Sequence, residues 1–149
     1  MKLIDTYNYP TSTRANIGGL RHYDINGEAQ KLPSVTTVIA QTKDKKDKES
    51  IERWKQKVGE ARAEEIKNEA AARGTAMHKY LEDLILGQRS MDLTTTGQEA
   101  QKMAEIIADR GLNRCSDIYG VEATLYYPGL YAGSCDLIGK IDDKLSIID

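Results

Sequence analysis

The alternation of apolar and polar residues divides the chain into a strand-rich start, a helical middle and a strand-rich end. From residue 49 to residue 110, apolar residues recur at intervals of three and four, which is typical of helices with one buried face. From residue 117 onward the interval becomes two, which is typical of half-buried strands. The pattern predicts an α+β fold with an N-terminal β-hairpin, a helical region and then an antiparallel β-meander.

The N-terminal hairpin is predicted around Asn26-Gly27. This dipeptide favours a type I′ turn, in which both central residues need positive φ. It lies between two segments with strand character, Ile17–Ile25 and Glu28–Leu32. The polar residues 1–16 predict no regular element.

The helical region is predicted to begin with a short element. Ser34 could cap a helix through Ala40, although the run Val35–Ile39 also has strand propensity, and we favour the helix. A charged connector is predicted from Thr42 to Lys48. The longer predicted helices are Glu49–Val58, interrupted by Gly59, then Glu60–Leu86, ended by Gly87, and Gly97–Arg110, ended by Gly111, with a loop from Gln88 to Thr96.

Gly74 lies inside the longest predicted helix. An interior Gly destabilises a helix by about 1 kcal/mol relative to Ala. The helix is therefore expected either to break near Arg73 or to bring its backbone close to another group. After Gly74, five residues at helical spacing predict a buried stripe: Met77, Tyr80, Leu81, Leu84 and Ile85.

Three C-terminal strands are predicted, at Asp117–Tyr127, Leu130–Ile141 and Lys144–Asp149. Gly133 and Gly139 in the second of them mark a bulge or a close approach of another group. The chain stops inside the third strand, so we expect residues 1–149 to be one domain that is the N-terminal part of a longer one.

Two carboxylates are predicted to face each other in the last hairpin. If Ile141 and Lys144 close its turn, Asp136 lies directly opposite Asp149. Opposed like charges destabilise an antiparallel pair, and a divalent cation with oxygen ligands can compensate. The alternatives are a solvated face, or a register slip that separates the two side chains.

His78 and Glu82 are four residues apart, so they share one face of the long helix. They could ligate one metal ion or form a surface pair, and the spacing alone favours the surface pair.

The composition describes a globular chain of 149 residues, with 40% apolar and 30% charged residues. There is no apolar run near the roughly 20 residues that a membrane span needs, and no signal peptide, which predicts a cytoplasmic protein. Two Cys outside any Cys/His cluster suit a reducing compartment and argue against a zinc site.

The formal net charge is −2, so nucleic-acid binding would need a local basic patch. Basic residues crowd the segment 43–57, which also contains four acidic residues. This mixture favours a solvated linker that leads into a helix, and a DNA-binding patch is the alternative. The candidate DNA-binding residues are Lys45, Lys46, Arg53 and Arg73.

Three short motifs resemble those of one nuclease superfamily. Residues 73–78, Arg-Gly-Thr-Ala-Met-His, resemble the helix motif of RecB-like nucleases in the PD-(D/E)XK superfamily. Residues 133–138, Gly-Ser-Cys-Asp-Leu-Ile, and residues 145–149, Leu-Ser-Ile-Ile-Asp, resemble its metal-binding core. Residues 32–39 resemble the N-terminal part of phage-type exonucleases and of the mitochondrial genome-maintenance exonuclease family. Together these motifs cover most of the chain in the family's order.

The resemblance implies a role for each matching residue. Asp136 corresponds to the metal-binding Asp, Asp149 to the first residue of the (D/E)XK triplet, and His78 to the helix His that completes the metal shell. Glu122 matches a frequent acidic position of the preceding strand. The family's lysine would lie two residues after Asp149, where this chain has ended.

The resemblance implies a Mg²⁺- or Mn²⁺-dependent DNA exonuclease, acting on single-stranded DNA ends, from a bacterium or a phage-infected cell. Its catalytic residues would be Asp136 and Asp149. One alternative is an inactive fragment that binds metal or DNA, since the motif lysine is missing. Another is a small structural protein in which the opposed carboxylates are coincidental.

Overall fold

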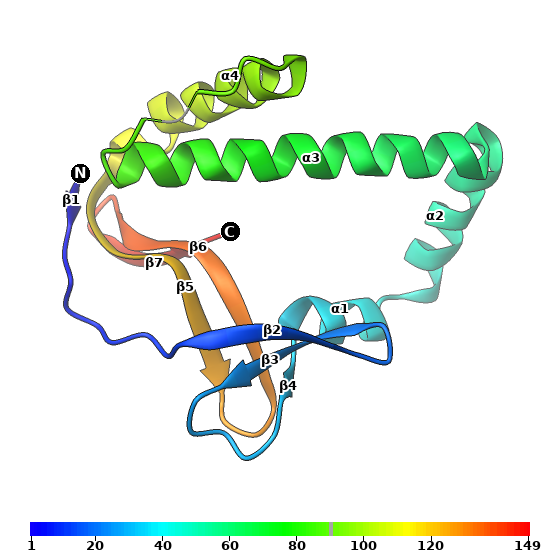
Figure 1. The fold of residues 1–149 in the computed structure, drawn as a ribbon, viewed down its shortest axis with the longest axis horizontal. Helices are drawn as coiled ribbons and strands as arrows, with labels where there is room; N and C mark the ends of the chain where they lie inside the picture. The colour runs from blue at the N-terminus through cyan, green and yellow to red at the C-terminus, as the bar shows by residue number, and fades with distance from the viewer. Residues whose placement is uncertain (90) are drawn as a thin grey trace.

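A computed structural model describes residues 1–89 and 91–149 of the chain. It confirms the α+β fold, with strands at both ends of the sequence and helices between them. Figure 1 shows the long helix α3 on one side of the molecule and the strands on the other. The strands are β1 Lys2–Leu3, β2 Ser12–Ile17, β3 Leu20–Ile25, β4 Leu32–Pro33, β5 Cys115–Tyr127, β6 Tyr131–Ile141 and β7 Lys144–Ile148. The helices are α1 Val35–Thr42, α2 Lys45–Val58, α3 Glu60–Ile85 and α4 Thr95–Arg110, followed by the 3₁₀ turn η1 Leu112–Arg114.

The predicted N-terminal hairpin is confirmed in part, because β3 pairs antiparallel with β4 across Asn26-Gly27, but β4 is short. β3 also pairs with β2 through a turn that was not predicted, Gly18-Gly19. These two glycines have φ of 59° and 81°, which are the two positive values that a type I′ turn needs. At the expected turn only Gly27 has positive φ, so Asn26-Gly27 is not a type I′ turn and begins a longer loop that joins β3 to β4. Residues 1–16, expected to be irregular, contain β1 and all of β2 except Ile17.

The C-terminal meander is confirmed. The four-stranded sheet has the order β1-β5-β6-β7, in which β1 is parallel to β5 and the other pairs are antiparallel. Asp142 and Asp143 form the β6–β7 turn with positive φ of 48° and 63°. The register runs from Ile141 opposite Lys144 to Leu137 opposite Ile148, as the turn predicted.

The short helix after β4 is confirmed as α1. Ser34 is its N-cap, and the Ser34 Oγ accepts a hydrogen bond of 3.0 Å from the Thr37 amide. The predicted connector at Thr42–Lys48 is too long, because α2 begins at Lys45. Asp47 in the first turn of α2 complements the partial positive charge of the helix N-terminus.

Helix α3 runs through Gly74 without a break. No atom of another described segment lies within 4 Å of the position that a Cβ would take there, so both alternatives predicted for Gly74 are wrong. The helix breaks at its ends instead, at Gly59 with φ of 87° and at Gly87 with φ of 69°.

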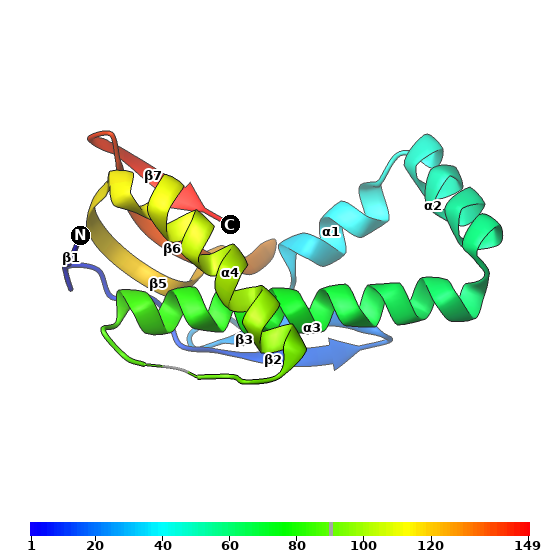
Figure 2. The same ribbon diagram turned by 90° about the horizontal axis from the view of Figure 1, so that it is seen from above.

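Helix α4 packs against α3 through small residues, and Figure 2 shows it crossing α3 at an angle. Ala100 and Ala104 are buried in this contact. The stripe predicted to be buried on α3 is only half-buried at Met77, Tyr80, Leu81 and Ile85. It is wrong at Leu84, which is 48% exposed, whereas Ile85 packs on the sheet. The predicted loop at Gln88–Thr96 includes residue 90, which lies outside the described residues.

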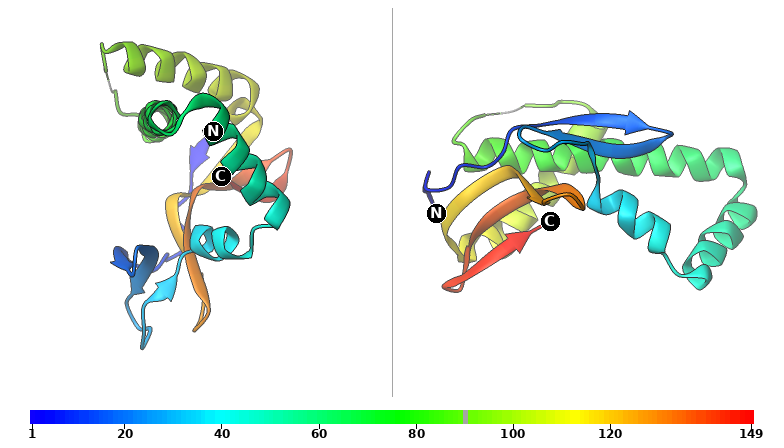
Figure 3. Two further views of the ribbon diagram at one scale, coloured as in Figure 1. Left: turned by 90° about the vertical axis from the view of Figure 1, so that its right-hand side faces the viewer. Right: turned by 90° about the horizontal axis from the view of Figure 1, so that it is seen from below.

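The two sheets are joined along the β5–β6 hairpin. Figure 3 shows α3 and α4 near one end of this hairpin and the sheet β2-β3-β4 near the other. Ala132 of β6 is buried with Tyr23, Ile25 and Leu32 of the smaller sheet. The middle of the hairpin therefore lies between a helical layer and a second sheet. None of the helices in the described part of the chain has the length and apolar content needed to span a membrane.

Gly139 marks a close approach, as predicted from its place in a strand. A Cβ there would lie 2.8 Å from the Cys115 Sγ and 2.9 Å from the Asp117 carbonyl oxygen. The β5–β6 register shifts in this region, between Cys115 and Gly120. The missing side chain of Gly139 lets the two strands stay close through this irregularity.

Candidate active site

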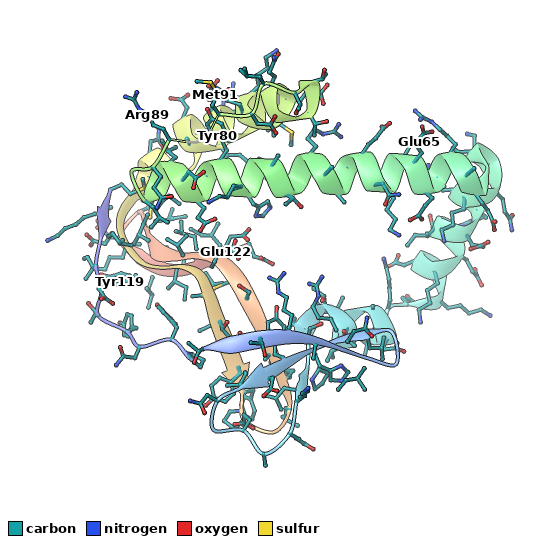
Figure 4. All side chains as sticks on the ribbon, viewed as in Figure 1. Glu65, Tyr80, Arg89, Met91, Tyr119 and Glu122 are labelled. Carbon is teal, nitrogen blue, oxygen red and sulfur yellow. The ribbon has the colours of Figure 1, made fainter. Side chains whose placement is uncertain are left out.

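Three elements bring a histidine and two carboxylates together. His78 comes from α3, Glu122 from β5 and Asp136 from β6, and one potential ligand atom of each lies within 4.8 Å of the others. The His78 Nδ1 is 3.0 Å from the Asp136 Oδ1. Figure 4 shows Glu122 between the strands and α3. The structure thus places three of the four predicted metal ligands in one cluster, which we call the acidic cluster.

The strand register explains why carboxylates gather here. Val121 pairs with Leu137 and Ala123 with Cys135, so Glu122 lies directly opposite Asp136. On the other side of β6, the last pair is Leu137 with Ile148, and Asp149 follows directly after β7. A central carboxylate with an acidic neighbour on each side is destabilised by repulsion unless a positive charge compensates.

Glu122 also has an unusual backbone. Its φ is 49°, a value that non-glycine residues rarely adopt, and it lies in the middle of a long strand. Strain of this kind persists where the surrounding structure enforces it, and it is common at functional sites. The Glu122 carboxylate accepts a hydrogen bond of 3.5 Å from the Ser134 hydroxyl.

Asp149 lies outside the 4.8 Å group within the described part of the chain, although it lines the same cavities as Glu122 and Asp136. The negative charge of Asp149 also acts on the buried thiol of Cys135. The pKa of Cys135 is raised, first by burial and further by the negative charges of Asp149, Asp136 and Glu122. Three carboxylates therefore act on one point of the sheet.

The donor atoms fit a divalent cation. Two ligands about 2.1 Å from an octahedral ion, at right angles to each other, are about 3.0 Å apart. The His78–Asp136 separation has this value. Carboxylate oxygens suit Mg²⁺ and Mn²⁺, and an added imidazole suits Mn²⁺. The side chains of His78 and Asp136 are 42% and 31% exposed, so water and a ligand can reach them.

The spacing of four residues would allow Glu82 to pair with His78, but in the structure Glu82 contacts Lys79 instead. Its carboxylate lies 3.6 Å from the Lys79 Nζ, and Lys79 also bonds to the buried Asp83 at 2.6 Å. These contacts raise the pKa of Lys79, chiefly through the hydrogen bond with Asp83. Glu82 lines the edge of one cavity and remains a distant candidate ligand.

Two cavities meet at the acidic cluster, and Glu122, Asp136 and Asp149 line both. The first has a volume of about 250 Å³ and lies beneath α3, with an apolar lining that includes Met77 and Leu81. The second has a volume of about 640 Å³ and extends toward the N-terminal sheet.

The four predicted DNA-binding residues lie away from these cavities. Lys45 is 3.8 Å from Glu49, and the Arg53 Nε donates to the Glu49 carbonyl oxygen at 3.4 Å. Arg73 pairs with Glu99 of α4 at 3.2 Å. The structure therefore does not bring these residues, or Lys46, into the acidic cluster, and their role in binding DNA stays a prediction.

Sequence reasoning missed two arginines. Arg14 and Arg21 line the second cavity from β2 and β3. Arg14 was missed because residues 1–16 were expected to be irregular, and Arg21 was missed because the predicted strand Ile17–Ile25 was not expected to pair with a strand that carries Arg14. The signal that could have found them is Gly18-Gly19, a hairpin dipeptide whose flanking residues alternate in polarity.

The α+β fold brings a histidine of α3 beside carboxylates of one sheet. Comparison with known proteins favours a nuclease-related protein. The chain is 27% identical over 128 residues to mitochondrial genome maintenance exonuclease 1 of Mus musculus. The aligned region covers 82% of the chain and 37% of this relative. The chain is 28% identical over 128 residues to mitochondrial genome maintenance exonuclease 1 of Homo sapiens, and this aligned region covers 79% of the chain and 36% of the relative. The chain thus spans little more than a third of the length of these relatives. No family model matches the chain.

Proposed function

We propose that this chain is a Mg²⁺- or Mn²⁺-dependent exonuclease of the PD-(D/E)XK superfamily that hydrolyses phosphodiester bonds at single-stranded DNA ends. The acidic cluster carries this proposal, because His78, Glu122 and Asp136 converge from three different elements. The similarity to two proteins named exonucleases supports it.

The residues of the cluster would have distinct roles. His78, Asp136 and Glu122 would hold the ion, with Asp149 completing the oxygen ligands. The separation of 3.0 Å between the His78 Nδ1 and the Asp136 Oδ1 suits two neighbouring ligands of one ion. A bound divalent cation would neutralise charge on the phosphate and lower the pKa of a water molecule. The half-exposed cluster leaves room for the phosphate and the water beside these carboxylates.

A second candidate is a metal- and DNA-binding module that does not turn over. One observation favours it: no lysine lines either cavity among the residues that the structure describes. The nearby Lys79 is held by Asp83 at 2.6 Å. A lysine beside the carboxylates would help to position and deprotonate the attacking water, so hydrolysis would be slow without one.

A cleavage assay on end-labelled DNA tests both candidates. The chain is incubated with Mg²⁺ or Mn²⁺ and a single-stranded oligonucleotide, its duplex, or the RNA of the same sequence. Asp136→Asn removes a charge from the cluster, and Asp109→Asn removes one from the exposed face of α4 as a matched control.

We expect mononucleotides to be released from single-stranded DNA by the wild type and by Asp109→Asn, and the rate to fall at least about 100-fold in Asp136→Asn. Metal-dependent binding without release of nucleotides would support the second candidate. If the chain neither cleaves nor binds DNA in the presence of either metal, both candidates are wrong.

A further inference from the structure

The larger cavity has opposite charges at its two ends. Asp136 and Asp149 line the end at the acidic cluster, and Arg14 and Arg21 line the end at the N-terminal sheet. Its volume of about 640 Å³ falls within the range of about 300–1,000 Å³ that is usual for small-ligand sites. A ligand that spans the cavity would therefore meet cationic side chains at one end and the candidate metal ligands at the other.

The two arginines form a pair on one face of the β2–β3 hairpin. Arg14 pairs with Tyr23 and Asn16 with Arg21, so Arg14 and Arg21 are diagonal neighbours on that face. Both side chains are exposed. No Asp or Glu oxygen lies within 4.0 Å of either guanidinium in the described residues. Two adjacent guanidinium groups without a carboxylate partner suit a phosphate, which accepts paired hydrogen bonds from arginine.

Aromatic rings line the same cavity. Tyr127 and Tyr131 close the β5–β6 hairpin with ring centroids 6.0 Å apart and an interplanar angle of 33°. The residues are 58% and 41% exposed, so part of each side chain is free to take a ligand. Half-exposed tyrosines beside basic side chains are typical of surfaces that bind single-stranded nucleic acid, in which unpaired bases stack on the rings.

We propose that this cavity is a subsite for an unpaired nucleotide of a DNA strand whose neighbouring phosphate lies at the acidic cluster. Arg14 and Arg21 bind a phosphate of the strand, and Tyr127 and Tyr131 take a base. A base that is stacked inside a duplex cannot reach the tyrosines, so the subsite selects single strands. This inference rests on the proposed function and names the residues that hold its substrate.

Binding measured without cleavage tests the subsite. The full chain is titrated into fluorescein-labelled oligothymidylate in EDTA, by anisotropy, over a series of salt concentrations. Arg14→Gln combined with Arg21→Gln removes the paired charges. Lys102→Gln combined with Arg110→Gln removes the same charge from exposed positions of α4 and is the matched control.

We expect the Arg14/Arg21 variant to bind about tenfold more weakly than the wild type. The slope of log K against log salt should become shallower by about 1.4, because each phosphate contact on a single strand contributes about 0.7. The control variant should keep the slope of the wild type. Tyr131→Ala should weaken binding about tenfold and Tyr131→Phe should not, since the ring provides the stacking surface.

The variant with both arginines replaced by Lys retains the charge, and circular dichroism shows whether the Gln variant is folded. If the Gln variant binds with wild-type affinity and slope, or if a duplex binds as tightly as the single strand, the subsite is wrong even when the chain is a nuclease. If binding depends on the arginines and the tyrosine but no metal supports cleavage, the subsite holds and the exonuclease proposal fails.

Discussion

The His78 Nδ1 and the Asp136 Oδ1 lie 3.0 Å apart, and this contact ties α3 to the central strand of the larger sheet. Asp136 has Glu122 opposite it on β5 and Asp149 one step beyond the last pair on β7. The helix thus supplies a nitrogen atom to the acidic cluster, and the sheet supplies the oxygen atoms. A cation bound here would relieve repulsion that the fold otherwise carries.

Adding Mn²⁺ should therefore stabilise the fold. A ligand at 100 times its Kd stabilises a folded protein by about 2.7 kcal/mol. For a chain of this size that corresponds to a rise in Tm of about 5–10 °C. Asp136→Asn should abolish most of this rise, because it removes the negative charge of the carboxylate that lies next to both His78 and Glu122. Thermal melts by circular dichroism, with and without Mn²⁺, measure the effect.

The Tm of Asp136→Asn without added metal provides a second test. Asp136→Asn should melt at or above the Tm of the metal-free wild type, since it removes the repulsion among Glu122, Asp136 and Asp149. Asp109→Asn is the control and should keep the full response to Mn²⁺. An equal rise in Tm for the wild type and Asp136→Asn would show that Mn²⁺ binds elsewhere.

The C-terminal half could be predicted from the sequence because its register is local. The turn at Asp142-Asp143 fixes the pairing of β6 with β7 as far as Leu137 opposite Ile148, and Asp136 and Asp149 are the next residues beyond that pair. The position of Glu122 opposite Asp136 depends instead on the register shifts of β5 between Cys115 and Gly120. Apolar and polar periodicity does not record such shifts.

The N-terminal strand pairing could be predicted only in part because two turn signals compete there. Asn26-Gly27 is a strong local hairpin signal, but Gly18-Gly19 provides the two positive φ values. The outcome is decided by packing, since Ile25 and Leu32 are buried against Ala132, which lies about a hundred residues away in the sequence. Arg14 and Arg21 reach the cavity only through this pairing.

Two glycines give opposite predictions for stability. Gly139→Ala should destabilise the fold by about 1–3 kcal/mol, because its Cβ would lie 2.8 Å from the Cys115 Sγ and 2.9 Å from the Asp117 carbonyl oxygen. Gly74→Ala should stabilise it by about 1 kcal/mol, since the helix is continuous there and no described atom of another segment is within 4 Å. Urea denaturation of both variants measures the free energies. A destabilised Gly74→Ala would show that another group approaches α3 at this residue.

The pH dependence of stability should reveal the ion pair between Asp142 and Arg114. The hydrogen bond from the Arg114 guanidinium holds the pKa of Asp142 below its ordinary value of 3.8. A lowered carboxyl pKa stabilises the fold above the unfolded pKa, and this stabilisation is lost as the pH falls through the folded pKa. The Tm of the wild type relative to Asp142→Asn should therefore stay constant near neutral pH and fall below about pH 3.8. Asn tolerates a positive φ well, but any stability gained in this way does not depend on pH, so it does not mask this change.

Asp143→Asn is the matched control, because Asp143 shares the turn, with φ of 63°, but has no Lys or Arg partner within 4.0 Å in the described residues. Its comparison with the wild type should change less over the same range, and equal pH courses for the two variants would show that the ion pair does not contribute.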